Sequence, residues 1–150
     1  MSARGGTPPR VLAVVGVAAV AGLGVIAAAL VSLALGSHGD SYLAGTFGLL
    51  VAGTVADRFP VPIEGSEGSV SLAFVFSVAA VVLFGWDAGV IVAVVPPTLM
   101  QLIDHRPWTR IAYNASVFAV TAALAGLASA PFGTDSVWRL LVTVTIASTV

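Results

Sequence analysis

The chain has 150 residues, of which 58% are hydrophobic and 9% are charged, and its mean hydropathy is +1.05. A soluble domain carries about 25% charged residues, so this composition leaves too little polar surface to cover a water-soluble fold. The absence of cysteine excludes disulfides and thiolate chemistry, and the net charge of −1 gives no indication of a nucleic-acid partner. The apolar runs are continuous rather than alternating, which predicts an all-α integral membrane protein.

A polar tail, residues 1–10, precedes the first apolar run. Residues 11–36 contain no charge and would form a helix of about 39 Å, which exceeds the roughly 30 Å core of a bilayer. The run is also longer than the roughly 7–15 apolar residues of a signal peptide. We therefore favour a first transmembrane helix over a cleaved signal.

The second apolar run, residues 41–56, follows a turn that contains His38 and ends at Asp57 and Arg58. With Phe59 included, this run is just long enough to cross a bilayer as a second helix. For His38 we favour a solvated position in the turn over a role as a proton switch.

Residues 59–76 show a different pattern. Pro60 and Pro62 prevent a continuing helix, and a turn-like polar stretch follows at residues 64–68. Apolar residues alternate on both sides of that stretch, which predicts a short extended hairpin at the membrane surface. A connecting loop is favoured over a lid or a ligand-contacting hairpin.

Four further helices are predicted, over residues 71–84, 88–103, 108–130 and 136–150, which makes about six transmembrane helices. Gly85, Trp86 and Asp87 are expected to form a turn. Pro96 and Pro97 remove backbone hydrogen bonds from the fourth helix, so we expect a kink or break there and regard the pair as a candidate hinge. Because no basic residue closes the sixth helix, we expect the 11–150 membrane domain to be truncated before a cytoplasmic output domain.

Residues 104–116 form the densest polar stretch of the chain and are predicted to connect the fourth and fifth helices at the membrane interface. Polar residues that helical spacing places on shared faces could line a small ligand cavity between these two helices. The candidates for that cavity are Ser77, Thr98, Gln101, Arg110, Asn114 and Thr121. The alternative, favoured for each residue, is that they are contacts between packed helices.

The arginines indicate how the chain is oriented. An alternating six-helix path places Arg4, Arg10, Arg58, Arg106 and Arg110 on one side and Arg139 on the other. Basic residues concentrate on the cytoplasmic side of membrane proteins. We therefore expect a multi-pass protein of the bacterial inner membrane with a cytoplasmic N-terminus.

No catalytic pattern is present in the sequence. The two histidines, His38 and His105, lie far apart, no His and acidic residues have metal-ligand spacing, and no glycine-rich phosphate-binding loop occurs. We expect no catalytic residue, metal or cofactor within these residues.

Three stretches together resemble a known module. DRFPVPI at residues 57–63, GSVSLAF at 68–74 and RPWTRIAYNAS at 106–116 follow one another in a way that resembles the N-terminal MASE-like membrane region of bacterial HD and HD-GYP phosphohydrolases and GGDEF diguanylate cyclases. Tyr113 stands where phenylalanine is expected, and Ser116-Val117 where alanine-glutamine is usual.

The resemblance implies a membrane-embedded sensory or anchoring input module for a cyclic-dinucleotide enzyme that would lie beyond Val150. Its expected partners are the lipid bilayer and the attached output domain. Signalling modules of this kind often work as homodimers, although the sequence specifies no interface. The alternative function is a small substrate-binding membrane subunit of a transporter.

Overall fold

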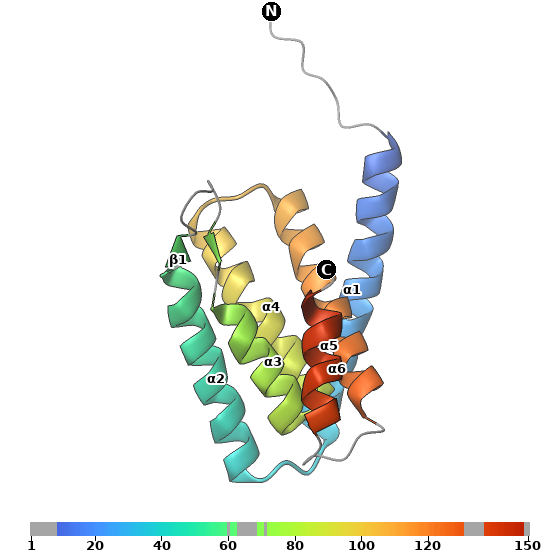
Figure 1. Ribbon diagram of the computed structural model, residues 1–150. Coiled ribbons are helices and arrows are strands. Elements are labelled where there is room, and N and C mark those ends of the chain that lie inside the picture. The colour runs from blue at the N-terminus through green and yellow to red at the C-terminus, as the bar shows by residue number, and fades with distance from the viewer. Residues whose placement is uncertain (1–8, 60, 63–68, 71, 131–136, 149–150) are drawn as a thin grey trace, which may run out of the picture.

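The computed structural model describes residues 9–59, 61–62, 69–70, 72–130 and 137–148, which form six helices and one pair of very short strands (Figure 1). The helices are α1 (Pro9–Leu35), α2 (Asp40–Arg58), α3 (Ala73–Phe84), α4 (Trp86–Ile103), α5 (Trp108–Ser129) and α6 (Val137–Ser148). The all-α class is confirmed, and each helix lies within two residues of its predicted bounds.

Three of these helices are long and apolar enough to cross a membrane, over Ala13–Leu35, Trp86–Ile103 and Trp108–Ser129. The other three differ in length or polarity. α3 and α6 have 12 residues each, about 18 Å of helix, and α2 carries Asp40, Asp57 and Arg58 at its ends. The prediction of six spans therefore goes beyond the three that length and composition support.

The short strands β1 (Val61–Pro62) and β2 (Ser69–Val70) lie between α2 and α3. They pair antiparallel, with Val61 opposite Val70. Residues 63–68, which hold the turn of the predicted hairpin, lie outside the described residues. The extended hairpin as a whole thus stays a prediction.

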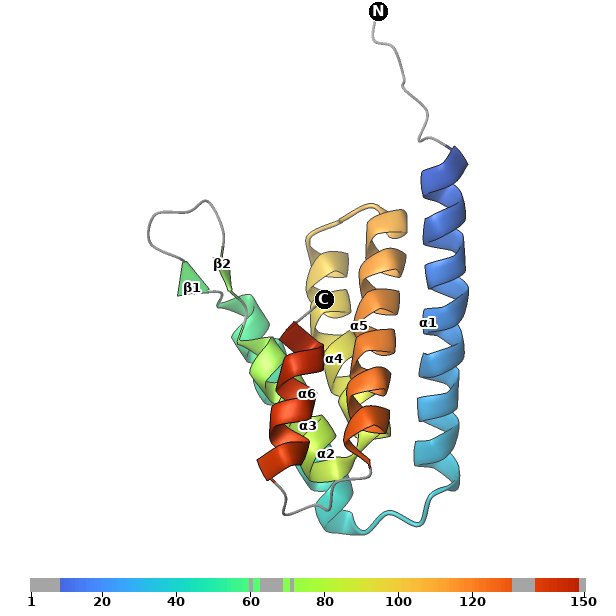
Figure 2. The same cartoon turned by 45° about the vertical axis from the view of Figure 1, so that its right-hand side comes forward.

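α4 occupies the centre of the bundle. It packs against α1, α2, α3 and α5, while α6 packs against α5 and α3. Although α1 and α2 are consecutive, they do not pack against each other anywhere in the described part of the chain, because they lie on opposite sides of α4 (Figures 1 and 2). A cluster of small side chains forms the core between α1, α4 and α5, namely Ala29, Val90, Ala93, Val94, Ala119, Ala122 and Ala123.

Glycines bring the helices close together. Gly22 of α1 faces Ser116 of α5, and Gly126 of α5 faces the backbone of Trp86, so that an added Cβ at either glycine would overlap its neighbour. Between α3 and α4 the whole connection is Gly85, whose φ of 105° is a conformation that glycine adopts without strain. The predicted turn at Gly85, Trp86 and Asp87 is thus wrong for its last two residues, which begin α4.

α4 continues through Pro96 and Pro97 and does not break there. Pro96 has no N–H group, which leaves the carbonyl of Val92 without its helical donor. The Ser77 hydroxyl of α3 lies 3.4 Å from that carbonyl oxygen and donates to it. A neighbouring helix therefore supplies one of the hydrogen bonds that proline removes, as is common where proline lies inside membrane helices.

Successive helices alternate in direction, which sorts the arginines by end (Figure 1). The start of α1, the end of α2 and the connection from α4 to α5 lie at one end of the bundle, which we call the arginine end because it carries Arg10, Arg58, Arg106 and Arg110. α6, with Arg139 in its first turn, begins at the opposite end. Arg4 lies outside the described residues.

Candidate functional site

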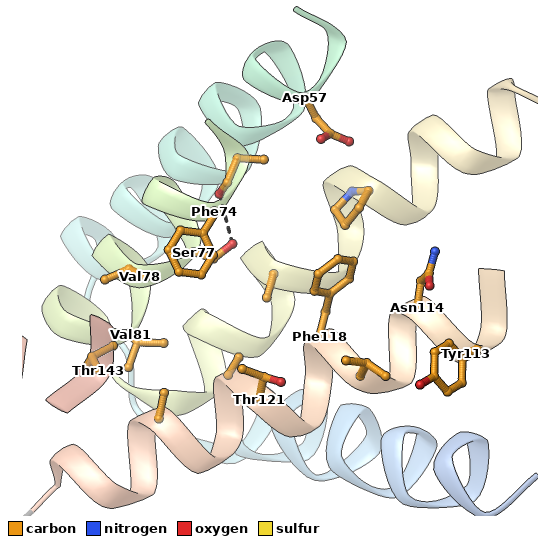
Figure 3. A pocket seen from close by; sticks show the side chains of 16 residues that line it. Asp57, Phe74, Ser77, Val78, Val81, Tyr113, Asn114, Phe118, Thr121 and Thr143 are labelled. Atoms are coloured by element: carbon orange, nitrogen blue, oxygen red, sulfur yellow. Dashed lines mark hydrogen bonds between the residues drawn. The ribbon is translucent and has the colours of Figure 1, made fainter. Parts of the chain in front are cut away.

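A cavity of about 540 Å³ lies among α3, α4, α5 and α6, with the end of α2 at one side (Figure 3). Most of the residues that line it are apolar or small. They are Asp57, Ala73, Phe74, Ser77, Val78, Val81, Ala93, Pro97, Tyr113, Asn114, Val117, Phe118, Thr121, Ala122, Ala125 and Thr143.

Helical spacing explains why these residues share one wall. In α3 the lining residues Phe74, Ser77, Val78 and Val81 follow each other at i, i+3, i+4 and i+7, which places them on one face. The α5 residues 114, 118, 121, 122 and 125 do the same at i, i+4, i+7, i+8 and i+11. The walls of α4 and α5 carry alanine at several of these positions, and the short side chains leave the space unfilled.

Polar groups are not spread evenly along the cavity. Asp57, Tyr113 and Asn114 lie toward the arginine end, whereas Val81 and Thr143 lie at the other end (Figure 3). Ser77 and Thr121 lie between these two ends. The cavity is therefore more polar toward the arginine end, and its walls are mainly hydrocarbon.

Three of the six predicted cavity residues line this cavity: Ser77, Asn114 and Thr121. The Nδ2 of Asn114 donates to the Oε1 of Gln101 at 2.9 Å, so Gln101 contacts a lining residue without lining the cavity itself. Arg110 is exposed and does not line the cavity.

The other predicted residues have different surroundings. Thr98 lies outside the lining, and its buried hydroxyl has no hydrogen-bond partner. Of the two prolines, Pro97 lines the cavity and Pro96 is buried against Gly53 of α2. The cavity was expected between α4 and α5, but α3 and α6 contribute walls as well. Which helices line the cavity depends on contacts between segments far apart in the sequence, and the periodicity of a single helix does not predict such contacts.

Ser77 connects the cavity wall to α4. Its hydroxyl lies 3.1 Å from the carbonyl oxygen of Ala73, one turn back in α3, and 3.4 Å from that of Val92. The second contact reaches the carbonyl that Pro96 leaves without a donor. A ligand that moved Ser77 would thereby change the hydrogen bonding of α4 next to its prolines.

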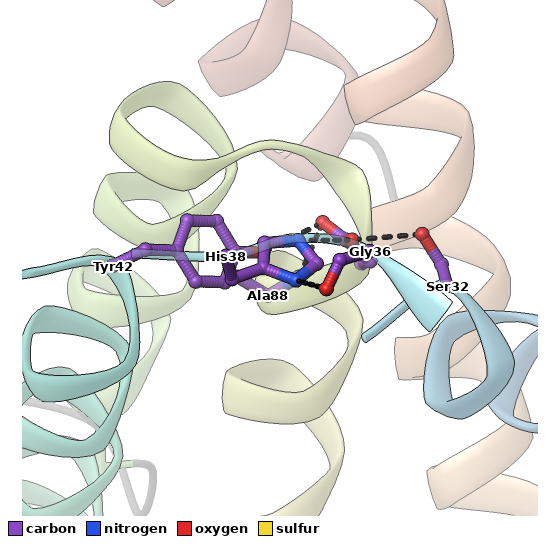
Figure 4. A network of polar contacts seen from close by, with 6 residues as sticks. Ser32, Gly36, His38, Tyr42 and Ala88 are labelled. Carbon is purple, nitrogen blue, oxygen red and sulfur yellow. Dashed lines mark hydrogen bonds and ion pairs between the residues drawn. The ribbon is translucent and has the colours of Figure 1, made fainter. Parts of the chain in front are cut away.

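A second polar cluster lies at the end of the bundle opposite the arginine end, around the carboxylate of Asp87 (Figure 4). Asp87 is only 6% exposed. Ser32 of α1 donates to its Oδ2 at 2.9 Å, and Tyr42 of α2 donates to its Oδ1 at 3.0 Å. The backbone N–H of Ala88 donates to the same Oδ1 at 2.9 Å. One carboxylate thus holds α1, α2 and α4 together.

His38 belongs to the same cluster, which corrects the expectation of a solvated turn residue. Its side chain is 18% exposed, and its Nε2 lies 3.8 Å from Oδ2 of Asp87. The imidazole also stacks on the ring of Tyr42, with 4.1 Å between ring centroids. The physical reason is that a buried carboxylate is costly unless polar groups surround it.

Tyr42 lies in the first turn of α2, outside the three candidate spans. Burial raises the pKa of its hydroxyl, and so does the hydrogen bond to the Asp87 carboxylate. Tyr42 therefore stays protonated and acts as a donor. With each carboxylate oxygen partnered, the Asp87 cluster is suited to holding helices rather than to moving protons.

Sequence reasoning did not single out Asp87. The sequence did contain a signal, because an acidic residue at the start of an apolar helix requires partners if it is buried. The alternating path places the connection between the first two helices at the same end of the bundle as Asp87. The polar residues in and beside that connection are Ser32, His38 and Tyr42. Of the region 104–116, only residues 104–107 connect α4 to α5, with Asp104, His105 and Arg106 exposed, and the remaining residues form the start of α5.

No group of three or more His, Cys, Asp or Glu residues could hold a metal ion within the described ranges. Comparison of the chain with protein-family models, with curated proteins and with solved structures gave no match.

Proposed function

We propose that this protein is a membrane-embedded sensory module that binds a small ligand in the cavity among α3, α4, α5 and α6. The cavity carries the proposal, because its volume of about 540 Å³ falls within the roughly 300–1,000 Å³ of small-molecule sites. Mainly apolar walls with a few polar groups at one end are also typical of such sites.

The proposed setting is the bacterial inner membrane, with the helices crossing it in alternating directions and the arginine end in the cytoplasm. Three candidate spans support membrane insertion. Exposed apolar side chains along α1, including Val14, Val17, Val20 and Leu23, would contact lipid. The arginine asymmetry supports the orientation.

The proposed signal passes from the cavity to α4. Ser77 and Pro97 both line the cavity, and Ser77 donates to the carbonyl that Pro96 leaves without a partner. A ligand that shifts this contact would change the equilibrium between two conformations of α4, as a two-state mechanism requires. The resemblance to input regions of cyclic-dinucleotide enzymes supports an attached cytoplasmic enzyme as the receiver.

The absence of cysteine allows a direct test of ligand binding. Thr121→Cys places a thiol in the cavity, and Leu124→Cys places one on the exposed face of the same helix. In phosphatidylcholine nanodiscs, 1-dodecanol is expected to slow maleimide modification of the Thr121→Cys protein and to leave that of the Leu124→Cys protein unchanged. Equal rates with and without 1-dodecanol at both positions would rule out this cavity as a binding site.

Transport is the second candidate, because binding sites of transporters often adjoin interrupted helices and this cavity adjoins Pro97. A membrane-impermeant thiol reagent separates the two functions. In inside-out and right-side-out vesicles, a sensor should expose Thr121→Cys from one side only. Modification from both sides would indicate alternating access and favour transport.

A further inference from the structure

We infer that the cavity selects a flat phenolic compound, whose ring lies between Phe74 of α3 and Phe118 of α5 and whose hydroxyl reaches Asn114. This inference rests on the proposed function and adds the chemical class of the ligand. It follows from the aromatic rings that line the cavity, from what surrounding lipid offers to a ligand, and from the polar groups beside these rings.

Two phenylalanine side chains lie on opposite sides of the cavity at its middle. Phe74 belongs to the α3 wall and Phe118 to the α5 wall (Figure 3). Their side chains are 42% and 40% exposed, although both residues line the cavity. A large part of each side chain is therefore not covered by protein, and an occupant of the cavity can contact both rings.

Neither of these rings packs against another aromatic side chain. In the part of the chain that the structure describes, ring contacts join Tyr42 with His38 and with Phe84, and Phe74 and Phe118 have none. Phe84 shows the packed alternative, because its ring meets that of Tyr42 edge-on with 5.3 Å between centroids. The rings of Phe74 and Phe118 thus remain available to an aromatic ligand.

The surrounding bilayer makes contact with these rings the source of selectivity. A hydrocarbon chain that enters the cavity leaves lipid, which is as apolar as the cavity walls, so its burial gives little preference for the cavity. Lipid tails contain no aromatic rings, whereas contact between rings is favourable beyond the area that it buries. A rigid ring also loses less conformational freedom on binding than a flexible chain does. Selectivity over lipid therefore comes from Phe74 and Phe118.

A polar group next to one ring gives the ligand its hydroxyl. Asn114 lines the cavity one turn before Phe118, on the same face of α5. Its Nδ2 donates to Oε1 of Gln101 at 2.9 Å, which leaves Oδ1 as an acceptor. A phenolic hydroxyl can donate to this oxygen while its ring lies against Phe118.

The same ring position connects binding to the proposed signal. Phe74 precedes Ser77 by three residues and lies on the same face of α3. The Ser77 hydroxyl donates to the carbonyl of Val92 at 3.4 Å. A ligand held at Phe74 is thus placed to shift the contact on which the proposed signal depends.

Three probes test the preference for a ring: 2-naphthol, trans-decahydro-2-naphthol and 1-dodecanol. The first two share a carbon skeleton and a hydroxyl, but only 2-naphthol is flat and aromatic. Each probe is titrated against maleimide modification of the Thr121→Cys protein in phosphatidylcholine nanodiscs, with Leu124→Cys as the control for nonspecific lipid effects. Concentrations are corrected for partition into protein-free nanodiscs. We expect 2-naphthol to protect at a concentration about fivefold below that of its saturated analogue, the factor that one aromatic contact supplies.

The two rings are tested by Phe74→Leu and Phe118→Leu in the Thr121→Cys background, because leucine keeps an apolar side chain and removes the ring. Each replacement should lower the preference for 2-naphthol over its saturated analogue, and the double replacement should abolish it. Phe47→Leu is the matched control and should leave the preference unchanged, because Phe47 is 67% exposed on α2 and lies outside the lining.

The hydroxyl contact is tested by Asn114→Leu in the same background. This replacement should weaken protection by 2-naphthol about fivefold, the factor that one hydrogen bond supplies, and should leave protection by naphthalene unchanged. An equal loss for 2-naphthol and naphthalene would contradict the hydroxyl contact.

Two results would overturn the inference and leave the proposed function standing: equal protection by 2-naphthol and its saturated analogue, or a preference for 2-naphthol that survives the double replacement. The comparison of these two probes in the Thr121→Cys protein decides the matter even if the double replacement does not fold. Absence of protection by 2-naphthol, its saturated analogue and 1-dodecanol would instead sink the proposed function, and the inference with it.

Discussion

At the scale of single residues, Asp87 has the most demanding surroundings, because its buried carboxylate accepts hydrogen bonds from α1, from α2 and from its own helix. Asp87→Asn should destabilise the bundle by about 1–3 kcal/mol, since the amide group opposes one of these donors and leaves a buried group unpaired. Thermal unfolding in detergent measures the change. Asp40→Asn, on an exposed residue of α2, is the control and should stay within about 0.5 kcal/mol. Equal stability of the two variants would contradict the holding role of Asp87.

Ser77 gives a second prediction at this scale. Ser77→Ala leaves the carbonyl of Val92 without a donor and should lower stability by roughly 0.6–2 kcal/mol. Thr54→Ala is matched, because the hydroxyl of Thr54 donates only to the i−4 carbonyl of Leu50 in its own helix. The same unfolding assay should show a larger loss for Ser77→Ala; a loss no larger than that of Thr54→Ala would argue against the bridge to α4.

Which polar residues meet was only partly predictable from the sequence. Spacing placed Gln101 and Asn114 on the polar faces of neighbouring helices, and the structure joins them by a hydrogen bond. Asp87 follows a glycine and a tryptophan, which is typical of a turn, and its partners Tyr42 and Ser32 lie 45 and 55 residues away. Local patterns contain no information about contacts of that range.

At the scale of the helices, glycine-to-alanine substitutions should be destabilising where two helices approach closely and harmless where the glycine faces open space. Gly126→Ala would press a Cβ against Trp86 and force α5 away from α4, which should reduce stability by about 1–3 kcal/mol. Gly48→Ala meets no atom within 4 Å and should raise stability by up to about 1 kcal/mol, because alanine has the higher helix propensity. Melting temperatures in detergent give both signs. A stabilising Gly126→Ala would contradict the packing of α4 against α5.

The prolines of α4 belong to the same scale. Replacing Pro96 and Pro97 with alanine restores two backbone N–H donors and removes the ring clashes, so α4 should lose the alternative shape that the proposed signal requires. In a longer protein that carries an output enzyme, the double replacement should change the enzymatic output without abolishing membrane insertion. Unchanged output would count against a hinge at these residues.

Helix positions followed well from the sequence because polar turns interrupt continuous apolar runs, as at His38 and at residues 104–107. The continuation of α4 through its prolines did not follow. The hydrogen bond that compensates for Pro96 comes from Ser77 of α3, and a proline in isolation gives no sign of such help. The contribution of α3 and α6 to the cavity could not be predicted either, because it also depends on contacts between different helices.

At the scale of the whole molecule, the arginine end should face the cytoplasm. His105 lies in the exposed connection at that end, and Ser37 lies in the exposed turn at the opposite end, so His105→Cys and Ser37→Cys place one thiol at each end. In intact cells an impermeant maleimide should modify Ser37→Cys and leave His105→Cys untouched until the membrane is permeabilised. The reverse pattern would show that the N-terminus faces outward.

The Asp87 cluster also sets an order of events during synthesis. Because α1 and α2 do not pack against each other within the described residues, their shared acceptor arrives only with α4. Asp87 follows Tyr42 by 45 residues and Ser32 by 55, a delay of about 2–11 s at ribosomal rates of roughly 5–20 residues per second. Until Asp87 is made, the first two helices lack the carboxylate that both of them contact, so their relative position can be fixed by it only once the start of α4 has been synthesised.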